Sequence, residues 1–199
     1  MPKSQHPLIY ELPSIVSPLD LGLLFPVAQP IEVELGCGDS SFLVKYAEGH
    51  RTNNFIGVER LLGRIQKLDR KARREGLTNV RGIRIESSYF LQYLLPPNSV
   101  VALHIYFPDP WPKRKHVRHR LLNDQFPALA QGVLATGGKV FLRTDDANYY
   151  SQMLAVFGGT SMFGSIETPA ELAELRTDFE MEFNARGIPT QYAAYELLK

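Results

Sequence analysis

Two kinds of hydrophobic pattern alternate along the chain after residue 30. Short apolar or alternating runs, which are typical of buried strands, are separated by longer segments whose apolar residues recur every three or four positions. The alternation continues to residue 144, and a weaker strand pattern follows near residue 198. The predicted strands are Ile31–Leu35, Asn54–Glu59, Val80–Ile85, Val100–Phe107, Lys139–Thr144 and Gln191–Leu198.

The segments between these runs predict helices. In Leu61–Glu75, apolar residues follow one another at spacings of four, three and four, and Arg and Lys occupy the other face. A second long helix is predicted at about Arg118–Leu134, with Gly137 and Gly138 ending it. The apolar side of that helix would carry Leu122, Phe126, Leu129 and Val133. Shorter helices are predicted at Ser41–Glu48 and at about Ala147–Val156.

Strands separated by helices of this length indicate an α/β fold, with a parallel sheet covered by helices on both faces. Ligands of such sheets bind beyond the carboxyl ends of the strands. The loops that should carry function are therefore those after Leu35, Glu59, Ile85, Phe107 and Arg143. We divide the chain into a proline-rich N-terminal arm at residues 1–30, extended on the surface or partly disordered, and a single domain at residues 31–199.

Composition agrees with one globular domain. The 199 residues are 44% apolar and 22% charged, and no apolar run approaches the roughly 18 residues that cross a bilayer. Met1 to Gln5 are followed by prolines rather than by the apolar core of a signal peptide. The single cysteine, Cys37, cannot form an intrachain disulfide and is typical of a reducing compartment. We expect a soluble, cytoplasmic protein.

The net charge of +1 conceals an uneven distribution. From Lys113 to Arg120 there are five lysines and arginines and two histidines without an acid, and from Arg60 to Arg84 there are nine lysines and arginines against two acids. The acids gather after residue 166. A nucleic-acid backbone would meet a basic face, although the outer face of the helix at Leu61–Glu75 could simply be solvated.

A glycine turn follows the first predicted strand. Gly36 and Gly38 allow a ligand to approach the backbone closely, although many nucleotide-binding folds share such turns and a plain strand–helix turn remains an alternative. The third glycine common in these turns is absent, and Ser40 stands in its place.

Three acids lie within, at the end of or just after the first three predicted strands. Glu59 could accept hydrogen bonds from ribose hydroxyls in either NAD or S-adenosylmethionine. Glu34 favours the second, because a carboxylate near the sheet interior needs a partner such as a ligand amine. Alternatively, Glu34 shares an outward face with Glu32. Glu86 is a candidate acceptor for an adenine.

The loop Phe107–Lys113 has three prolines in five positions, and its stiffness would hold side chains in place at little entropic cost. Asp109 and Trp111 lie between these prolines, just past the buried strand Val100–Phe107. An acid and an aromatic side chain here are typical of methyltransferases that act on a ring nitrogen, where the acid accepts a hydrogen bond from the base edge and the aromatic ring packs on its face.

These motifs together resemble those of bacterial tRNA (guanine-N7)-methyltransferases. The resemblance covers about Leu19 to Leu198. It rests on the segments 34–38, 57–60, 107–120, 143–145 and 177–180, of which Pro-Asp-Pro-Trp-Pro-Lys is the most distinctive. It implies a Rossmann-like class I methyltransferase fold with a mostly parallel seven-stranded sheet. It also implies S-adenosylmethionine as methyl donor, S-adenosylhomocysteine as product, and guanine 46 of the tRNA variable loop as acceptor.

The resemblance also implies a role for individual residues. The cofactor contacts would be Glu34, Gly36, Gly38, Glu59, Glu86 and Asp109, with Asp109 also catalytic. The tRNA contacts would be Lys113, Asp145, Thr177, Asp178, Phe179 and Glu180, although composition alone predicts an acidic helix for the last four. Ser40 in place of glycine and Glu86 in place of Asp or Asn depart from the pattern.

Three other functions fit parts of the pattern. A related enzyme could methylate a small molecule or a protein, but it would leave the basic run Lys113–Arg120 without a purpose. An NAD-dependent oxidoreductase would suit the glycine turn and Glu59 but not Glu34. A non-catalytic RNA-binding protein of the same fold would suit Ser40. The five histidines show no metal-ligand spacing, so we expect no metal. The sequence leaves open a monomer or a homodimer.

Overall fold

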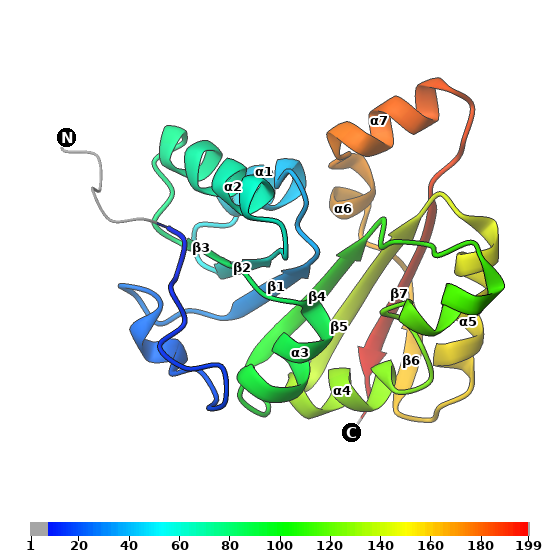
Figure 1. The fold of residues 1–199 in the computed structure, drawn as a ribbon, viewed down its shortest axis with the longest axis horizontal. Helices are drawn as coiled ribbons and strands as arrows, with labels where there is room; N and C mark the ends of the chain where they lie inside the picture. The colour runs from blue at the N-terminus through cyan, green and yellow to red at the C-terminus, as the bar shows by residue number, and fades with distance from the viewer. Residues whose placement is uncertain (1–7, 199) are drawn as a thin grey trace.

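The computed structural model of the chain describes residues 8–198. The seven strands in this range form one sheet in the order β3-β2-β1-β4-β5-β7-β6 (Figure 1). Strands β3, β2, β1, β4 and β5 run parallel, and β7 runs antiparallel to β5 and β6. The strands are β1 (Ile31–Leu35), β2 (Asn54–Val58), β3 (Val80–Ile83), β4 (Val100–Tyr106), β5 (Leu134–Thr144), β6 (Phe163–Ile166) and β7 (Gln191–Leu197). The predicted α/β fold and mostly parallel seven-stranded sheet are confirmed.

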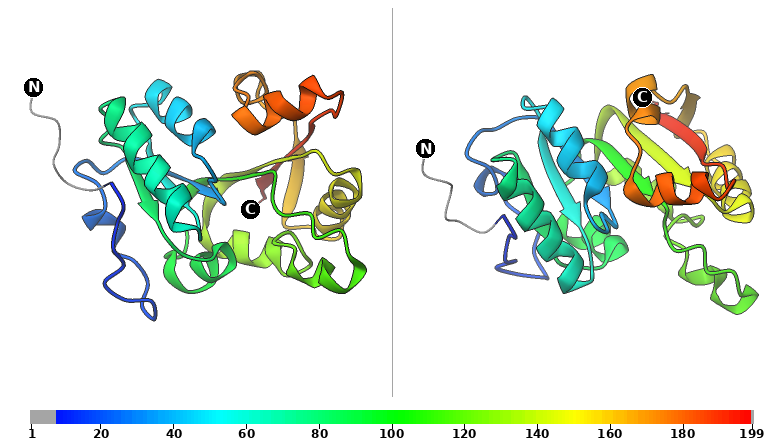
Figure 2. Two further views of the ribbon diagram at one scale, coloured as in Figure 1. Left: turned by 45° about the horizontal axis from the view of Figure 1, so that its top comes forward. Right: turned by 90° about the horizontal axis from the view of Figure 1, so that it is seen from above.

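Helices cover both faces of the sheet (Figure 1 and Figure 2). On one face α1, α2 and α6 share a hydrophobic cluster with the strands, and on the other α4 and α5 do so. The helices are α1 (Ser41–Gly49), α2 (Leu62–Arg74), α3 (Ser87–Tyr89), α4 (Phe126–Val133), α5 (Ala147–Gly158), α6 (Ala170–Glu174) and α7 (Asp178–Ala185). A π-helical turn, Phe90–Leu94, follows α3, and a 3-10 turn, η3 (Arg114–His119), follows β4.

Alternation along β1 decides which side chains meet which layer of helices. Ile31, Val33 and Leu35 join the cluster that contains α4 and α5. Successive side chains of a strand point to opposite faces, so Glu32 and Glu34 lie on the side of α1, α2 and α6. Both glutamates are buried there. One face of the central strand is therefore apolar, and the other carries two acids into the protein interior.

The predicted helix at Arg118–Leu134 is wrong in its first half. Residues Arg114–His119 form the turn η3, and α4 begins only at Phe126, with a proline in its first turn. Proline suits the first turn of a helix and disrupts the interior, so Pro127 marks a helix start. Leu122 is buried as expected, but it lies on a non-helical segment whose backbone N–H donates to the Tyr149 hydroxyl at 3.0 Å.

The pair Gly137 and Gly138 does not end a helix, which corrects a second prediction. Helix α4 ends at Val133, and β5 begins at the next residue. The glycines lie inside β5, where its register with β4 is irregular. Gly137 has a φ of +72°, which glycine adopts readily and which suits a bulge. The bulge allows one strand to run from α4 to the functional edge of the sheet.

The N-terminal segment packs against the domain over its described part, residues 8–30. Backbone hydrogen bonds of 2.8 Å join Leu8 and Tyr10 to Gly82, so the segment covers the edge strand β3. Leu19, Leu24 and Phe25 are then buried in the cluster that contains α4 and α5. Residues 1–7 of the predicted arm lie outside the described residues. The division into an arm at 1–30 and a domain at 31–199 stays a prediction.

Strand β6 and helices α3 and α6 have no counterpart among the predicted elements. Each is five residues long or shorter, so hydrophobic periodicity has too few positions to act on. The acidic helix that composition favours around Thr177–Glu180 is present as α7. Within residues 8–198 no helix is long and apolar enough to cross a membrane.

Candidate functional site

A pocket of about 500 Å³ opens beyond the carboxyl ends of β1, β2, β3 and β4. Ligands of parallel α/β sheets bind at this edge. The pocket brings together Gly36, Glu59, Glu86 and Asp109, four residues that the sequence places in separate loops. Its lining includes Leu35, Gly36, Glu59, Arg60, Leu61, Arg64, Ile85, Glu86, Ser87, Phe107, Pro108, Asp109, Trp111, Arg118, His119, Arg120, Leu121 and Asn123.

The glycine turn forms the floor of this pocket on the β1 side. Gly36 has a φ of +77°, and its N–H donates to the Val58 carbonyl at 2.9 Å. A Cβ placed on Gly36 would meet nothing within 4 Å, so the space beside this backbone is open to a ligand. Gly38 does not line the pocket, and its N–H donates to the Glu59 carboxylate at 3.2 Å. The turn therefore links the end of β1 to the end of β2.

Ser40 completes this turn in a conformation that favours glycine. Its φ is +63°, it is fully buried, and its hydroxyl contacts the Cys37 sulfur at 3.6 Å rather than capping α1. The left-handed region costs a residue with a Cβ about 1–2 kcal/mol. The departure from glycine thus leaves the turn intact and stores strain in it.

We expect Ser40→Gly to stabilise the protein by about 1 kcal/mol. Glycine relieves the backbone strain, and this gain exceeds the cost of its larger conformational entropy in the unfolded chain. Thermal unfolding should show a rise in Tm of about 2–4 °C, the shift that 1 kcal/mol produces in a domain of this size. The same change at Ser41, which lies in α1, should lower Tm because glycine is a poor helix residue. A lower Tm for Ser40→Gly would show that the Cys37 contact outweighs the strain.

Glu59 and Glu86 lie on one side of the pocket, at the ends of β2 and β3. Glu59 is 6% exposed, accepts the N–H groups of Gly38 and Leu61, and lies 3.8 Å from the Arg64 guanidinium. Glu86 is exposed, and its carboxylate caps α3 by accepting from Ser88 and Tyr89. Both carboxylates are held by backbone donors and keep lone pairs for a ligand.

Glu34 is not among the residues that line the pocket, and it is buried, so the alternative of an outward-facing side chain is wrong. It is 4% exposed, and its Oε2 has no hydrogen-bond partner among the described residues. Burial raises the pKa of Glu34 well above its ordinary value, the Arg143 charge lowers it in part, and Asp39 and Glu59 raise it further. Arg143 Nε is likewise buried without a partner. Glu34 is thus an acid that a cationic ligand group would satisfy.

The pKa of Glu34 predicts a pH-dependent gain of stability on substitution. The folded pKa of Glu34 is raised above the ordinary 4.5, so ionising this group destabilises the folded protein. The stability that the neutral carboxyl group provides is fully present below about pH 4.5 and is lost as the pH rises through the folded pKa. Glu34→Gln cannot ionise, so its Tm should exceed that of the native chain at pH 8, and the difference should shrink toward pH 5. Thermal scans across this range measure it. A variant that is less stable at pH 8 would show that Arg143 outweighs burial.

The proline-rich loop forms the opposite side of the pocket and is strained. Phe107 has a φ of +50° and Trp111 of +42°, and each precedes a proline. These conformations cost about 1–3 kcal/mol each, and residues before proline favour extended backbone instead. Asp109 is exposed and accepts no hydrogen bond from within residues 8–198. The loop thus presents an unengaged carboxylate next to the Trp111 ring.

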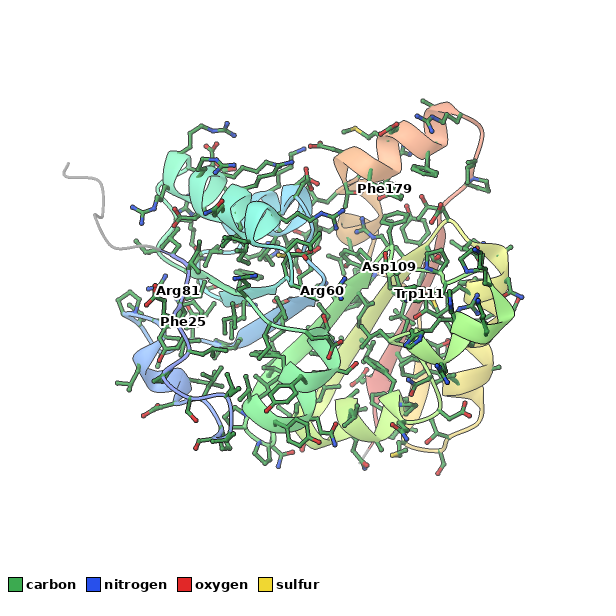
Figure 3. All side chains as sticks on the ribbon, viewed as in Figure 1. Phe25, Arg60, Arg81, Asp109, Trp111 and Phe179 are labelled. Carbon is green, nitrogen blue, oxygen red and sulfur yellow. The ribbon has the colours of Figure 1, made fainter. Side chains whose placement is uncertain are left out.

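Trp111 forms an aromatic cluster with the turn that follows it. Its ring centroid lies 5.7 Å from that of His116 and 5.4 Å from that of His119. In Figure 3, Asp109 and Trp111 are seen beside each other, to the right of Arg60 and below Phe179. Arg60 lines the same pocket from the β2 side. The ring centroids of Phe179 and Phe107 lie 4.9 Å apart. The loop therefore brings one flat aromatic surface, Trp111, and one acid, Asp109, to the same pocket.

The basic run Lys113–Arg120 is not uniformly exposed. Lys113, Lys115 and Arg118 are exposed, and Arg118 lines the pocket. Arg120 is buried at 3% exposure and bonds within the protein, so it cannot act as a surface cation. Arg60 and Arg64 add two positive charges on the other side of the pocket, and the periodicity of Leu61–Glu75 did not single them out.

None of the predicted substrate contacts lines the pocket. Thr177 is buried and caps α7 by accepting the N–H of Glu180, while Asp178 is exposed and donates its N–H to Ser41. Phe179 is 43% exposed, and its ring lies against that of Phe107. Asp145 is half-buried after β5 and does not line the pocket.

Glu180 has a different environment from its neighbours. It is fully buried and pairs with Arg143 at 3.0 Å, and the Tyr192 hydroxyl donates to its other oxygen. Arg143 also donates to the carbonyls of Leu172 and Leu175. Both Glu180 oxygens are therefore engaged inside the protein. The pair joins β5 to α6, α7 and β7, a role that no local sequence pattern indicates.

A second buried acid–base pair lies further along the same face of the sheet. Glu32 accepts from His104 at 2.7 Å and from Asn53 at 2.6 Å. Burial alone would raise the pKa of Glu32, but the hydrogen bond and charge of His104, with Asn53, hold it below its ordinary value. In the part of the chain that the structure describes, no three His, Cys, Asp or Glu side chains gather to hold a metal ion.

Known proteins resemble this chain in sequence. The profile of a family described as "Putative methyltransferase" matches residues 28–197. A tRNA (guanine-N(7)-)-methyltransferase of Bordetella pertussis is 30% identical over 191 residues, covering 95% of this chain and 74% of the relative. That of Geobacter metallireducens is 30% identical over 184 residues, covering 90% and 87%.

Solved structures of low sequence identity share the fold. The 16S rRNA methyltransferase KamB superposes with a TM-score of 0.61 at 14% identity, covering 86% of this chain and 89% of its own. A geranyl diphosphate C-methyltransferase of Streptomyces coelicolor, in complex with S-adenosyl-L-homocysteine, gives a TM-score of 0.53 at 16% identity, covering 87% and 72%. The class I methyltransferase fold implied by the sequence motifs is confirmed.

Proposed function

Because the chain belongs to the family of tRNA (guanine-N(7)-)-methyltransferases, we propose that it transfers a methyl group from S-adenosylmethionine to N7 of a guanine in tRNA. The observation that carries the proposal is the shared pocket of Glu59, Glu86, Asp109 and Trp111, since it joins acceptors for a nucleoside to an acid and a ring for a base. By the family resemblance the acceptor is guanine 46 of the variable loop, and the reaction takes place in the cytoplasm.

The residues of the pocket fit S-adenosylmethionine. Glu59 directly follows β2, where an acid can accept hydrogen bonds from two ribose hydroxyls, and Gly36 leaves open space beside its backbone. Glu86 offers an acceptor for the adenine. Glu34 is a buried acid with an unpartnered oxygen, and a ligand amine would supply its partner. When bound, the cofactor supplies a methyl group activated by a sulfonium.

On the acceptor side the protein has to orient the base rather than deprotonate it, because guanine N7 already carries a lone pair. Trp111 can pack on the purine face while Asp109 accepts a hydrogen bond from its edge, which fixes the direction of N7. Positive charge appears on the purine as its N7 is methylated. The fixed Asp109 carboxylate stabilises that charge at the moment it develops.

The tRNA backbone would meet cations on both sides of the pocket. Lys113, Lys115 and Arg118 lie on the loop side, and Arg60 and Arg64 lie on the β2 side. Asp145 and the exposed residues Asp178 and Phe179 extend the contact surface around the rim. We propose that Thr177 and Glu180 support this surface from inside the protein and do not contact the RNA, since both are buried.

The decisive experiment supplies labelled S-adenosylmethionine and unmodified tRNA, followed by mapping of the modified base. We expect 7-methylguanosine at position 46, absent from a tRNA whose guanine 46 is replaced by adenine. Labelling at another guanine would refute the position but not the reaction. Cofactor binding in calorimetry without any transfer to RNA would favour a small-molecule or protein acceptor.

Lys113→Ala should weaken tRNA binding while leaving S-adenosylmethionine binding unchanged, because Lys113 is exposed and lies outside the pocket lining. Each lost phosphate contact lowers the slope of log K against log salt by about 0.7–0.9. Binding titrations at several salt concentrations measure that slope. An unchanged slope would show that Lys113 touches no phosphate.

A further inference from the structure

Arg120 ends the basic run yet is almost completely buried. Its Nε donates to the Pro110 carbonyl at 2.7 Å, and its two terminal nitrogens donate to Gln152 Oε1 at 2.6 Å and Asn148 Oδ1 at 2.9 Å. The guanidinium lies 4.6 Å from the centroid of the Tyr149 ring. All three nitrogens of its planar fork are thus engaged within the protein.

These contacts join two elements that both border the site. Pro110 lies between Asp109 and Trp111, so its carbonyl belongs to a loop segment whose two flanking residues line the pocket. Asn148 and Gln152 lie one turn apart on α5, which follows Asp145. The segment after Arg120 is held by the same helix, since Gln152 donates to the Leu122 carbonyl at 2.8 Å. Arg120 therefore fastens the loop to a rigid helix.

The loop needs such a fastening. Phe107 and Trp111 both lie in the left-handed region directly before a proline, a conformation that persists only where the surroundings impose it. Phe107 is held by its N–H bond to the Arg143 carbonyl at 2.9 Å. At the Trp111 end, the hydrogen bond from Arg120 to Pro110 is the corresponding restraint, and it is charge-assisted.

We infer that Arg120 is a positioning residue for methyl transfer, which fixes Asp109 and Trp111 through the Pro110 carbonyl and contributes no phosphate contact. The inference rests on the proposed function. It divides the basic run into two roles, with the exposed cations on the RNA and the last one inside the protein. Lysine should replace it only in part, since an ammonium lacks the planar fork that reaches all three acceptors.

The test compares Arg120→Met, Arg120→Lys and the exposed neighbour Lys115→Met. Under saturating tRNA and cofactor, Arg120→Met should lower kcat between about 10-fold and 100-fold, the effect of a misplaced group. Arg120→Lys should recover part of the rate. The salt slope of tRNA binding should stay native in both Arg120 variants and fall by about 0.7–0.9 in Lys115→Met. A reduced slope in Arg120→Met, or a native kcat, would overturn the inference.

Trp111 is the single tryptophan of the chain and reports on the loop without any reaction. In Arg120→Met, acrylamide should quench the Trp111 fluorescence more strongly, and the fluorescence anisotropy should fall. Neither change should appear in Lys115→Met. If the native chain methylated no tRNA, the proposed function would fail while this readout still tested the restraint. Native fluorescence in Arg120→Met would refute the restraint itself.

If Arg120→Met does not fold, the pair Asn148→Ala and Gln152→Leu removes two acceptors and leaves the arginine in place. Asn148 is exposed, and Gln152 is only partly buried, so the helix should tolerate both changes. The double variant should show the same fall in kcat and the same loosening of Trp111, each smaller than in Arg120→Met. A native kcat and native Trp111 signal in a folded double variant would overturn the inference.

Discussion

Replacing Asp109 by asparagine should lower kcat for tRNA methylation at least about 100-fold, and replacing it by alanine should abolish turnover. The asparagine variant keeps the shape of the side chain and removes its charge, so it isolates the electrostatic contribution, for which single-group losses are about 10²–10³. Asp109 accepts no hydrogen bond from the described residues and faces the pocket, so the substitution should leave the fold unchanged. Single-turnover rates with saturating tRNA and cofactor measure the effect.

Asp124→Asn is the matched control for this prediction. Asp124 is an exposed acid on the same connection between β4 and α4, outside the pocket lining. Its loss should leave the rate within about twofold, since an exposed charge outside the pocket acts only weakly through water. Cofactor affinity, measured by calorimetry, separates a loss of binding from a loss of rate. Full turnover by Asp109→Ala under saturating substrates would remove Asp109 from the mechanism.

Glu180→Gln should produce the largest loss of stability among the site residues. Breaking a buried ion pair leaves an uncompensated charge and costs about 3–5 kcal/mol. Arg143 would lose the carboxylate and keep only carbonyl oxygens as hydrogen-bond acceptors in an interior position, since both members of the pair are 1% exposed or less. For a domain of this size the expected fall in Tm is about 10 °C. Thermal unfolding at neutral pH provides the measurement.

Glu182→Gln provides the comparison two residues further along α7. Glu182 pairs with Arg186, but both side chains are about 60% exposed, and such pairs contribute about 0–1 kcal/mol. Its Tm should therefore stay within about 3 °C of the native value. If Glu180→Gln left Tm unchanged and only raised KM for tRNA, Glu180 would be a direct substrate contact rather than a support of α7.

The sequence was most informative where burial on both faces of the sheet leaves a continuous apolar run, as in β4, or where a helix has one apolar side, as in α2. The predictions were wrong where a helix-like spacing of apolar residues, or a pair of glycines, belonged to another kind of structure. Leu122 and Phe126 are four residues apart, as in a helix, but the helix begins only at Phe126, with Pro127 in its first turn, and residues 121–125 before it form bends and turns. Gly137 and Gly138 mark a bulge inside β5 rather than an end.

For the site, the acids at the ends of consecutive strands could be predicted because parallel strands end at one edge of the sheet. The charged residues with structural roles could not. Arg120 and its exposed neighbours look alike in sequence, and only the packing of the loop on α5 distinguishes them. Arg143 and Glu180 are separated by 37 residues, and their pairing depends on the path of α6 and α7.

Strand β7 has a consequence for the order in which the protein forms during synthesis. It is translated after every other strand of the sheet, yet it lies between β5 and β6 and pairs with both. The parallel strands β1 to β5 can therefore associate on the ribosome, while β6 has no sheet partner until β7 emerges. Tyr192, which binds Glu180, arrives with β7. A nascent chain should thus form the pocket at the ends of β1 to β4 before Tyr192 can fasten α7 to the sheet.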